Sequence, residues 1–167
     1  MKIIHKEINN ENVSELIAFL KDVYMKNIGQ DKSERTYFKP IYLNNYIDKN
    51  AKLIYIEDFK DVKAFCLYTP ANKDKLIEDF ETEVEFYEDD EVETIYKYIE
   101  EIKPGVIYLD YIESFNIGYG SRLVDYLKSN YSDIILYAKY EAYNFWEKMN
   151  FLKVFGSTCV YPIKSVL

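Results

Sequence analysis

A strand that leads into a glycine-containing turn and then a helix constrains this chain more than any other feature. Residues 106–112, VIYLDYI, are apolar enough to form a strand at the centre of a sheet. Gly118 and Gly120 follow, and residues 118–130 repeat apolar side chains at helical spacing. The chain has only 5 glycines, so two at the start of one helix indicate that something approaches the backbone there. Free N–H groups and the positive end of the helix dipole favour an anion at such a turn, and we expect a phosphate.

The remaining pattern predicts alternating strands and helices. Before the turn we expect a strand at 3–8, a helix at 15–27 that Asn12 or Ser14 could cap, a continuous or broken helical segment at 37–50, and strands at 51–58 and 62–69 joined by a hairpin at 59–61. After the turn helix we expect a strand at 134–140, a helix at 141–150, and a final strand pair at 151–155 and 157–163.

Residues 70–104 form an insert between Pro70 and Pro104. A helix is predicted at 91–101, whereas 76–89 could be helix or loop. The resulting order is β-α-α-β-β-insert-β-α-β-α-β-β. We therefore predict an α/β fold with a mixed central sheet and helices on both faces, in a single domain covering 1–167.

The negative charge of the chain is concentrated in the insert. The formal net charge is -8, and residues 78–93 contain ten acidic residues and no basic one. The rest of the chain is close to neutral and has no basic stripe, which argues against a nucleic-acid partner. The acidic stretch is either a solvated surface or a lip that attracts a cationic substrate.

Other features narrow the location and the chemistry. No apolar run approaches the roughly 18 residues that span a bilayer, and the start of the sequence lacks the apolar segment of a signal peptide. We therefore expect a cytoplasmic protein with no membrane association, in which Cys66 and Cys159 are buried thiols. His5 is the only histidine, which argues against a catalytic triad or a histidine-rich metal site.

Two common phosphate-binding motifs fit the turn poorly. A dinucleotide-binding turn has a third glycine, and its position is Leu123 here. A P-loop has a Gly-Lys-Ser/Thr sequence after four spacer residues, and the chain contains none.

Residues 107–128 and 134–154 together resemble the GNAT family of N-acetyltransferases. Gly118-Tyr119-Gly120 matches the first family motif, and the second motif is matched by Ala142, Phe145, Glu147, Lys148 and Phe151. The resemblance implies an enzyme that transfers an acetyl group from acetyl-CoA to a primary amine, with no metal. The amine could belong to a polyamine, an aminoglycoside or a peptide, and dimers are common in this fold.

The resemblance also implies cofactor-binding residues. The pyrophosphate would lie on the turn, against backbone amides of Asn116, Ile117, Gly118, Tyr119, Gly120 and Ser121. A main-chain N–H near Ser114 or Phe115 would polarise the thioester carbonyl. Lys139 and Asn144 would complete the cofactor contacts, and the pantetheine arm would lie between strands 106–114 and 134–140.

Four positions depart from the family pattern. Phe115 replaces a Gln or Arg, so one phosphate contact is missing, and Lys139 replaces an Asn but could pair with a phosphate. Asn150 replaces a glycine, which is mild because asparagine tolerates the left-handed conformation. Trp146 replaces the tyrosine that protonates the departing thiolate, and an indole is no useful acid. Tyr143 and Tyr140 are the candidates to replace it.

Two carboxylates on the strand are candidates for the group that takes the proton from the amine. A charged Asp110 inside a central strand is costly unless it is paired or functional, so we favour it over Glu113. The two differ by three positions and would face opposite sides of a regular strand. Asp110 could instead pair with a lysine or a tyrosine. An alternative function is an acyl-CoA-binding sensor or interaction module without catalysis.

Overall fold

The computed structural model describes residues 1–29, 38–71, 73–102, 105–131 and 133–161. These residues divide into two compact units. Unit 1 comprises Met1–Thr69 and Asp110–Leu123, and unit 2 comprises Pro70–Leu109 and Val124–Leu167. The single domain expected from the sequence stays a prediction, since one strand and one helix contribute residues to both units.

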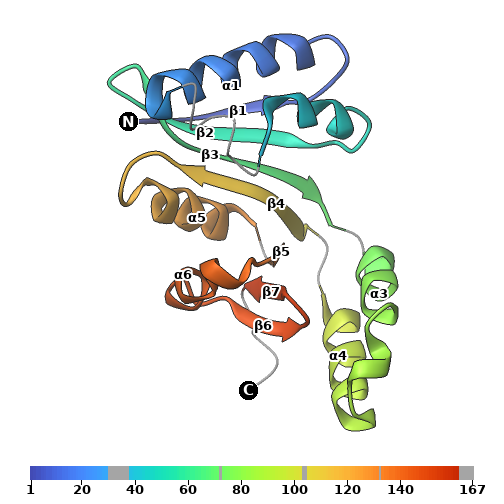
Figure 1. The fold of residues 1–167 in the computed structure, drawn as a ribbon. Coiled ribbons are helices and arrows are strands. Elements are labelled where there is room, and N and C mark those ends of the chain that lie inside the picture. Colours follow the sequence, from blue (N-terminus) through green and yellow to red (C-terminus); the bar gives the residue numbers. More distant parts are fainter. Residues whose placement is uncertain (30–37, 72, 103–104, 132, 162–167) are drawn as a thin grey trace. The chain divides into compact units, whose positions relative to one another are not determined.

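The elements follow the predicted order (Figure 1). They are β1 (Lys2–Glu7), α1 (Val13–Ile28), the 3-10 helix η1 (Pro40–Tyr46), β2 (Lys52–Asp58), β3 (Asp61–Pro70), α3 (Lys73–Glu81), the 3-10 helix η2 (Val84–Phe86), α4 (Asp89–Glu101), β4 (Ile107–Ser114), α5 (Tyr119–Asn130), β5 (Ile134–Tyr137), the 3-10 helix η3 (Tyr140–Ala142), α6 (Tyr143–Lys148), β6 (Leu152–Phe155) and β7 (Thr158–Tyr161).

The strands form a seven-stranded mixed sheet in the order β1-β2-β3-β4-β5-β7-β6. The pairs β1–β2, β2–β3, β5–β7 and β6–β7 are antiparallel, whereas β4 and β5 are parallel. Three pairs join β4 to β5, from Ile107–Ile134 to Leu109–Leu136, and β4 continues to Ser114. The predicted α/β class with a mixed sheet is thus confirmed.

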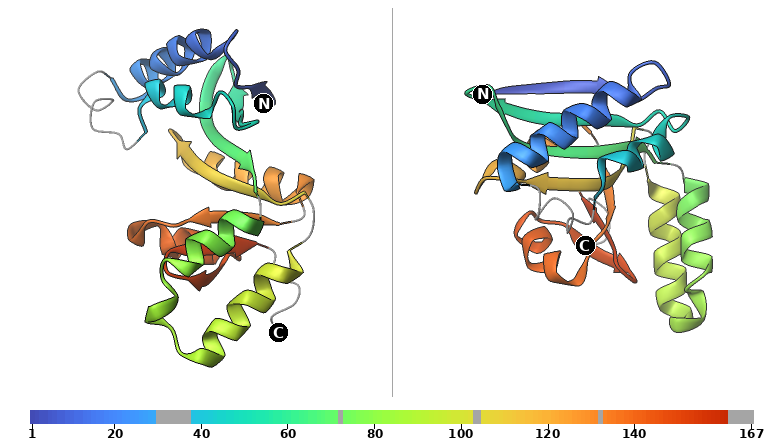
Figure 2. Two further views of the ribbon diagram at one scale, coloured as in Figure 1. Left: turned by 90° about the vertical axis from the view of Figure 1, so that its right-hand side faces the viewer. Right: turned by 45° about the horizontal axis from the view of Figure 1, so that its top comes forward.

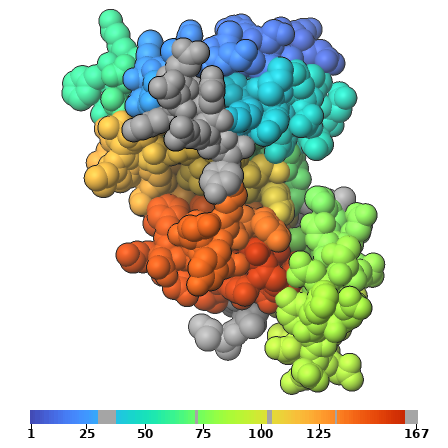
Figure 3. Space-filling view, viewed as in Figure 1, coloured from blue at the N-terminus to red at the C-terminus, as the bar shows by residue number. Residues whose placement is uncertain are grey.

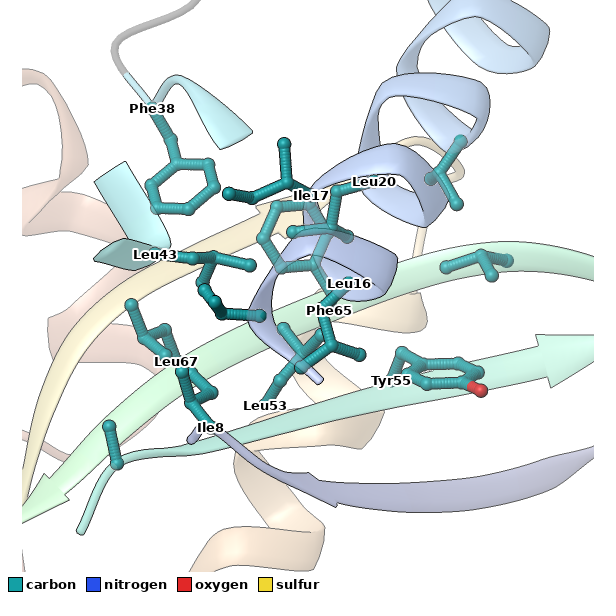
Figure 4. Packing of buried hydrophobic residues seen from close by; sticks show 14 of the residues in the cluster. Ile8, Leu16, Ile17, Leu20, Phe38, Leu43, Leu53, Tyr55, Phe65 and Leu67 are labelled. Atoms are coloured by element: carbon teal, nitrogen blue, oxygen red, sulfur yellow. The ribbon is translucent and has the colours of Figure 1, made fainter. Parts of the chain in front are cut away.

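The core of unit 1 forms where α1 packs on β2 and β3. Figure 4 shows Leu16, Ile17 and Leu20 of α1 directed toward Leu53 and Phe65 on the strands. Alternate residues of β2 and β3 that lie outside this cluster are buried as well, and they include Ile54, Ile56, Ala64 and Cys66. Both faces of these strands are therefore covered.

The hairpin between β2 and β3 has a two-residue turn. Asp58 pairs with Asp61, and both Phe59 and Lys60 between them have positive φ, 49° and 66°. Two positive φ values are the signature of a type I′ turn, whose twist matches that of the strands it joins. Asn and Gly are the usual residues there, so the predicted hairpin forms with an unfavourable turn sequence.

The acidic insert folds as the helix pair α3–α4 of unit 2, and Figure 2 shows the two helices side by side. In Figure 3 the surface of this pair adjoins that of the β6–β7 strands, where the Phe80 and Phe155 rings pack with centroids 5.0 Å apart. Glu88 and Glu91 form a capping box at the start of α4. The predicted helix at 91–101 is confirmed, and residues 76–89 are partly helical.

Several predicted boundaries shift. Asn12 is the N-cap of α1, but its side chain bonds to the Glu7 carbonyl and the Asn9 amide and does not cap the helix. The strand predicted at 134–140 ends at Tyr137, and a 3-10 turn precedes α6. The helical segment predicted at 37–50 is a 3-10 helix over Pro40–Tyr46. Four positions at the ends of predicted segments lie outside the described residues: residues 37, 104, 162 and 163.

Candidate functional site

The two positions of the turn that hold glycine require it for different structural reasons. Gly118 has a φ of +85°, which side chains other than glycine's adopt only with strain, and open space surrounds it. Gly120 does not need a positive φ, but a Cβ there would lie 3.2 Å from the Cβ of Ser114. The close approach that the sequence predicted at Gly120 is therefore made, at least in part, by the chain itself.

Ser114 organises the turn through its hydroxyl. Its Oγ accepts a hydrogen bond from the Gly120 N–H at 3.1 Å and donates one to the Asn116 carbonyl at 2.7 Å. The N–H of Tyr119 also donates to the Asn116 carbonyl, at 3.3 Å. The amides of Tyr119 and Gly120 are thus bonded within the turn, although the sequence placed both in the phosphate-binding set.

The other amides of the turn are available to a ligand. Within the described residues, the N–H groups of Asn116, Ile117, Gly118 and Ser121 have no hydrogen-bond partner. Asn116, Ile117 and Gly118 are exposed, and the turn opens the 12-residue helix α5. Unbonded amides at a helix N-terminus, where the helix dipole is positive, favour an anion such as phosphate.

β4 carries one more residue than the stretch of β3 beside it. The Phe115 N–H donates to the Lys63 carbonyl at 2.9 Å, and the Ala71 N–H donates to the Val106 carbonyl at 3.0 Å. Between these two bonds the chain advances eight residues along β3 but nine along β4. One residue of β4 is therefore bulged, and the alternation of its side chains between the two faces is interrupted.

Asp110 is paired with a hydroxyl from β3. Its Oδ2 accepts a hydrogen bond from Thr69 Oγ1 at 3.0 Å, in a half-buried setting. Burial, together with the nearby charge of Asp110, raises the pKa of the Tyr46 hydroxyl to about 12. The expectation that a charged Asp110 inside the strand would be paired or functional is consistent with these neighbours.

Glu113 is paired with a tyrosine of its own strand. Its Oε2 accepts a hydrogen bond from the Tyr111 hydroxyl at 2.8 Å. Burial, followed by the influence of Tyr24 and Glu113, raises the pKa of Tyr111 well above its usual range. Tyr111 is therefore a poor proton donor to a reacting group, although it holds the Glu113 carboxylate in place.

The two carboxylates lie on the same face of the sheet. Thr69 alternates along β3 with Phe65 and Leu67, whose side chains pack against α1. The Tyr111 ring, which bonds Glu113, lies 5.9 Å from the Phe65 ring between centroids. The prediction of opposite faces is wrong because it assumed a regular strand, and the bulge in β4 shifts the alternation by one residue.

Phe115 belongs to the core of unit 1. Its ring packs edge-on against Tyr24, with centroids 5.5 Å apart, and at a tilt against Phe65, at 6.1 Å. Its N–H is bonded to β3. Neighbouring N–H groups along an antiparallel strand point to opposite sides. The N–H of Ser114 therefore points away from β3, whereas that of Phe115 is bonded to it.

The candidate residues of unit 2 lie in and before α6. Lys139 and Asn144 are exposed, and Tyr143, the first residue of α6, is half-buried. The Tyr143 ring packs edge-on against Tyr140, with centroids 6.1 Å apart, and the Lys153 ammonium lies 5.6 Å from its centroid. Their roles in cofactor binding and catalysis stay predictions.

Two departures from the family pattern have structural explanations. Trp146 is buried, and its ring packs against those of Phe145 at 4.8 Å and Phe151 at 5.0 Å. It is a core residue of α6 and not a proton donor. Asn150 has a φ of 58°, so it adopts the left-handed conformation predicted for this replacement of glycine.

Three residues near the site were missed in the sequence. Thr69 and Tyr46 lie around Asp110, and Asp58 accepts a hydrogen bond from Tyr119. Each is brought to the site by pairing or packing over long sequence separations, and no local pattern marks them.

Within the described residues, no helix is long and apolar enough to cross a membrane.

Comparison with known proteins finds similarity in structure only. No family model matches the sequence, and no curated protein matches it. An acyl-CoA N-acyltransferase structure from Pseudomonas aeruginosa is similar with a TM-score of 0.56 and 8% identity, covering 97% of this chain and 100% of that one.

Two further structures are similar across nearly the whole chain. The Bacillus subtilis N-acetyltransferase YlbP in complex with coenzyme A has a TM-score of 0.53 and 16% identity, covering 97% of this chain and 96% of that one. The Drosophila melanogaster polyamine N-acetyltransferase has a TM-score of 0.51 and 11% identity, covering 97% and 100%. The resemblance noted in the sequence is thus confirmed at the level of structure: this chain has the fold of the GNAT N-acetyltransferases.

Proposed function

We propose that this protein transfers an acetyl group from acetyl-CoA to a primary amine. The observation that carries the proposal is the turn that opens α5, where the N–H groups of Asn116, Ile117, Gly118 and Ser121 have no partner within the described residues. The strand that leads into this turn carries two half-buried carboxylates on one face. The fold, which is shared with N-acetyltransferases, supports the same conclusion.

The turn fits the phosphate groups of coenzyme A. Its unbonded amides would hold the pyrophosphate at the positive end of α5. Arg122 is exposed in the first turn of α5, with its guanidinium 5.1 Å from the Tyr119 ring centroid, and would add a cation. We also propose Lys139 and Asn144 as cofactor contacts. When bound, acetyl-CoA supplies an acetyl group activated as a thioester.

The chain would contribute a hydrogen-bond donor and a proton acceptor. The Ser114 N–H, which points away from β3, would polarise the thioester carbonyl. Asp110, or Glu113 in second place, would take the proton from the substrate ammonium, so that the neutral amine forms the new C–N bond as the C–S bond breaks. We assign Tyr143 as the donor that protonates the departing sulfur. Tyr143 would regain a proton from the nitrogen, which loses its second proton as the amide forms.

The acceptor we propose is cationic. The α3–α4 pair carries the acidic stretch 78–93 on largely exposed positions, and such a field attracts polyamines and basic peptides. A structure of the same fold is a polyamine N-acetyltransferase, so a polyamine heads the panel of substrates. We expect kcat/KM for a polyamine to fall with rising salt, whereas kcat/KM for a monoamine changes little. Equal salt dependence for both would remove the steering argument.

The first test is calorimetric titration with acetyl-CoA, with NADH as the control ligand, followed by a turnover assay with the amine panel. Asp110→Asn and Glu113→Gln are then compared for kcat/KM across pH, with Glu11→Gln, an exposed acid before α1, as the control. We expect Asp110→Asn to lower kcat/KM by at least about 100-fold, the lower end of the usual range for acid–base groups. Changes of only a few-fold in both variants would exclude the general-base role.

A second function, acyl-CoA binding without catalysis, is favoured by one observation. The position of the usual proton donor holds Trp146, which is buried in the core. Binding of acetyl-CoA with no turnover of any amine would support this sensor function. Turnover at a rate that Tyr143→Phe lowers would support the enzyme and its assigned acid.

A further inference from the structure

The middle residue of the glycine turn is tied to a distant strand end. The Tyr119 hydroxyl donates a hydrogen bond of 2.6 Å to Oδ2 of Asp58, the last residue of β2. The other carboxylate oxygen, Oδ1, lies 3.0 Å from the Met1 amino group, and the Asp58 side chain is only 17% exposed. The bond joins residues 61 positions apart, so it fixes the turn relative to the β2–β3 hairpin.

A carboxylate at this place is unfavourable for binding phosphate by charge alone. Asp58 is bonded to the first residue of α5, next to the amides that we propose hold the pyrophosphate. By Coulomb's law its negative charge opposes an anion there. The charge of Asp58 should lower the affinity of the turn for an anion. Its presence beside the turn is explained if Asp58 fixes the geometry of the turn.

The bond also orients a cation. The Arg122 guanidinium lies 5.1 Å from the Tyr119 ring centroid, and Arg122 Nη1 lies 3.5 Å from Met1 Sδ. Because the hydroxyl of Tyr119 is held by Asp58, the plane of the ring is fixed, and the guanidinium stacked on it has a defined position. The first turn of α5 thus presents free amides and an oriented arginine together.

We infer that Asp58 and Tyr119 are a positioning pair that holds the turn 116–121 and Arg122 in the conformation that binds the phosphate groups of the cofactor. This inference rests on the proposed function for the identity of the ligand. Neither residue touches the reacting atoms. Their effect is expected on the affinity for acetyl-CoA and not on the acetyl transfer itself.

The test compares Tyr119→Phe, Asp58→Asn and the double variant by calorimetric titration with acetyl-CoA. Tyr119→Phe removes the hydroxyl but keeps the ring under Arg122. Asp58→Asn removes a negative charge, so charge alone predicts tighter binding, whereas loss of positioning predicts weaker binding. Glu57→Gln is the control, since it removes the same charge one residue away on β2.

We expect each single variant to raise the Kd for acetyl-CoA about 3- to 10-fold, the range expected for the loss of an ordinary intramolecular hydrogen bond. The double variant should be no weaker than the singles, because all three act on one contact: Tyr119→Phe removes its donor, and Asp58→Asn replaces its charged acceptor by a neutral amide. KM for acetyl-CoA should rise in parallel, with kcat and the amine KM unchanged. Unchanged or tighter binding by Asp58→Asn, or additive effects, would overturn the inference.

Amide hydrogen exchange of the ligand-free protein gives a readout that does not depend on activity. We expect both single variants to speed exchange at the amides of Tyr119 and Gly120, which are hydrogen-bonded within the turn, and Glu57→Gln to leave it unchanged. Wild-type protein that fails to bind acetyl-CoA would overturn the proposed function and its cofactor. Wild-type binding with unchanged exchange and unchanged Kd in Tyr119→Phe would overturn the positioning pair alone.

Discussion

Replacing Gly118 by alanine should strain the turn without creating a clash. Gly118 has a φ of +85° and no atom within 4 Å of the position that a Cβ would take. A left-handed conformation costs an L-residue about 1–2 kcal/mol, and alanine recovers about 0.4–1 kcal/mol by restricting the unfolded chain. The free energy of unfolding should fall by about 1 kcal/mol, which corresponds to a Tm lower by about 2–4 °C.

The same substitution should weaken acetyl-CoA binding more than it weakens the fold. If the alanine of the Gly118→Ala variant relaxes toward negative φ, the free amides of Ile117 and Ser121 on either side change direction, and we expect the Kd to rise severalfold. Gly118→Asn should cost less in both respects, since asparagine tolerates the left-handed region. Differential scanning calorimetry gives Tm, and titration calorimetry gives Kd.

Gly29→Ala is the matched control for this experiment. Gly29 has a φ of +75°, also with no atom within 4 Å of its Cβ position, but it lies after α1 and not in the turn. It should lower Tm and leave the Kd for acetyl-CoA unchanged. The reasoning fails if Gly118→Ala matches wild type in Tm and Kd, or if Gly29→Ala weakens binding equally.

Three further predictions concern stability. Lys128→Met should lower the free energy of unfolding, measured by chemical denaturation, by about 1–2 kcal/mol. The reason is that Lys128 Nζ donates to the Met149 carbonyl and lies 4.3 Å from the ring centroid of Tyr161. Equal stability of the variant and wild type would show that these contacts contribute nothing. Phe59→Asn with Lys60→Gly should raise Tm, since these residues suit two positive φ values, and a lower Tm would refute the type I′ assignment. The hydrogen bond from Tyr119, followed by one from the Met1 amino group, lowers the pKa of Asp58. Its stabilisation is therefore complete above the unfolded-state pKa of about 3.9 and lost as pH falls through the lower folded-state value. Unfolding titrations of Asp58→Asn below pH 4 should show a shallower pH dependence than wild type, and an identical slope would contradict this.

The sequence alone was enough for most elements and for the family resemblance. Continuous apolar runs marked the central strands, and helical spacing marked α1, α4 and α5, because these signals come from residues close together in the chain. The glycine pair located the turn, since a positive φ at Gly118 is a local requirement. These features need no knowledge of distant partners.

The tertiary structure decided which groups are available and which way they face. The bulge that places Asp110 and Glu113 on one face is visible only when β4 is counted against β3. The bonding of Gly120 to Ser114, and of Phe115 to β3, likewise removes amides that the sequence had assigned to a ligand. Hydrogen bonds and packing between residues far apart in the chain set these details, and a local pattern carries no record of them.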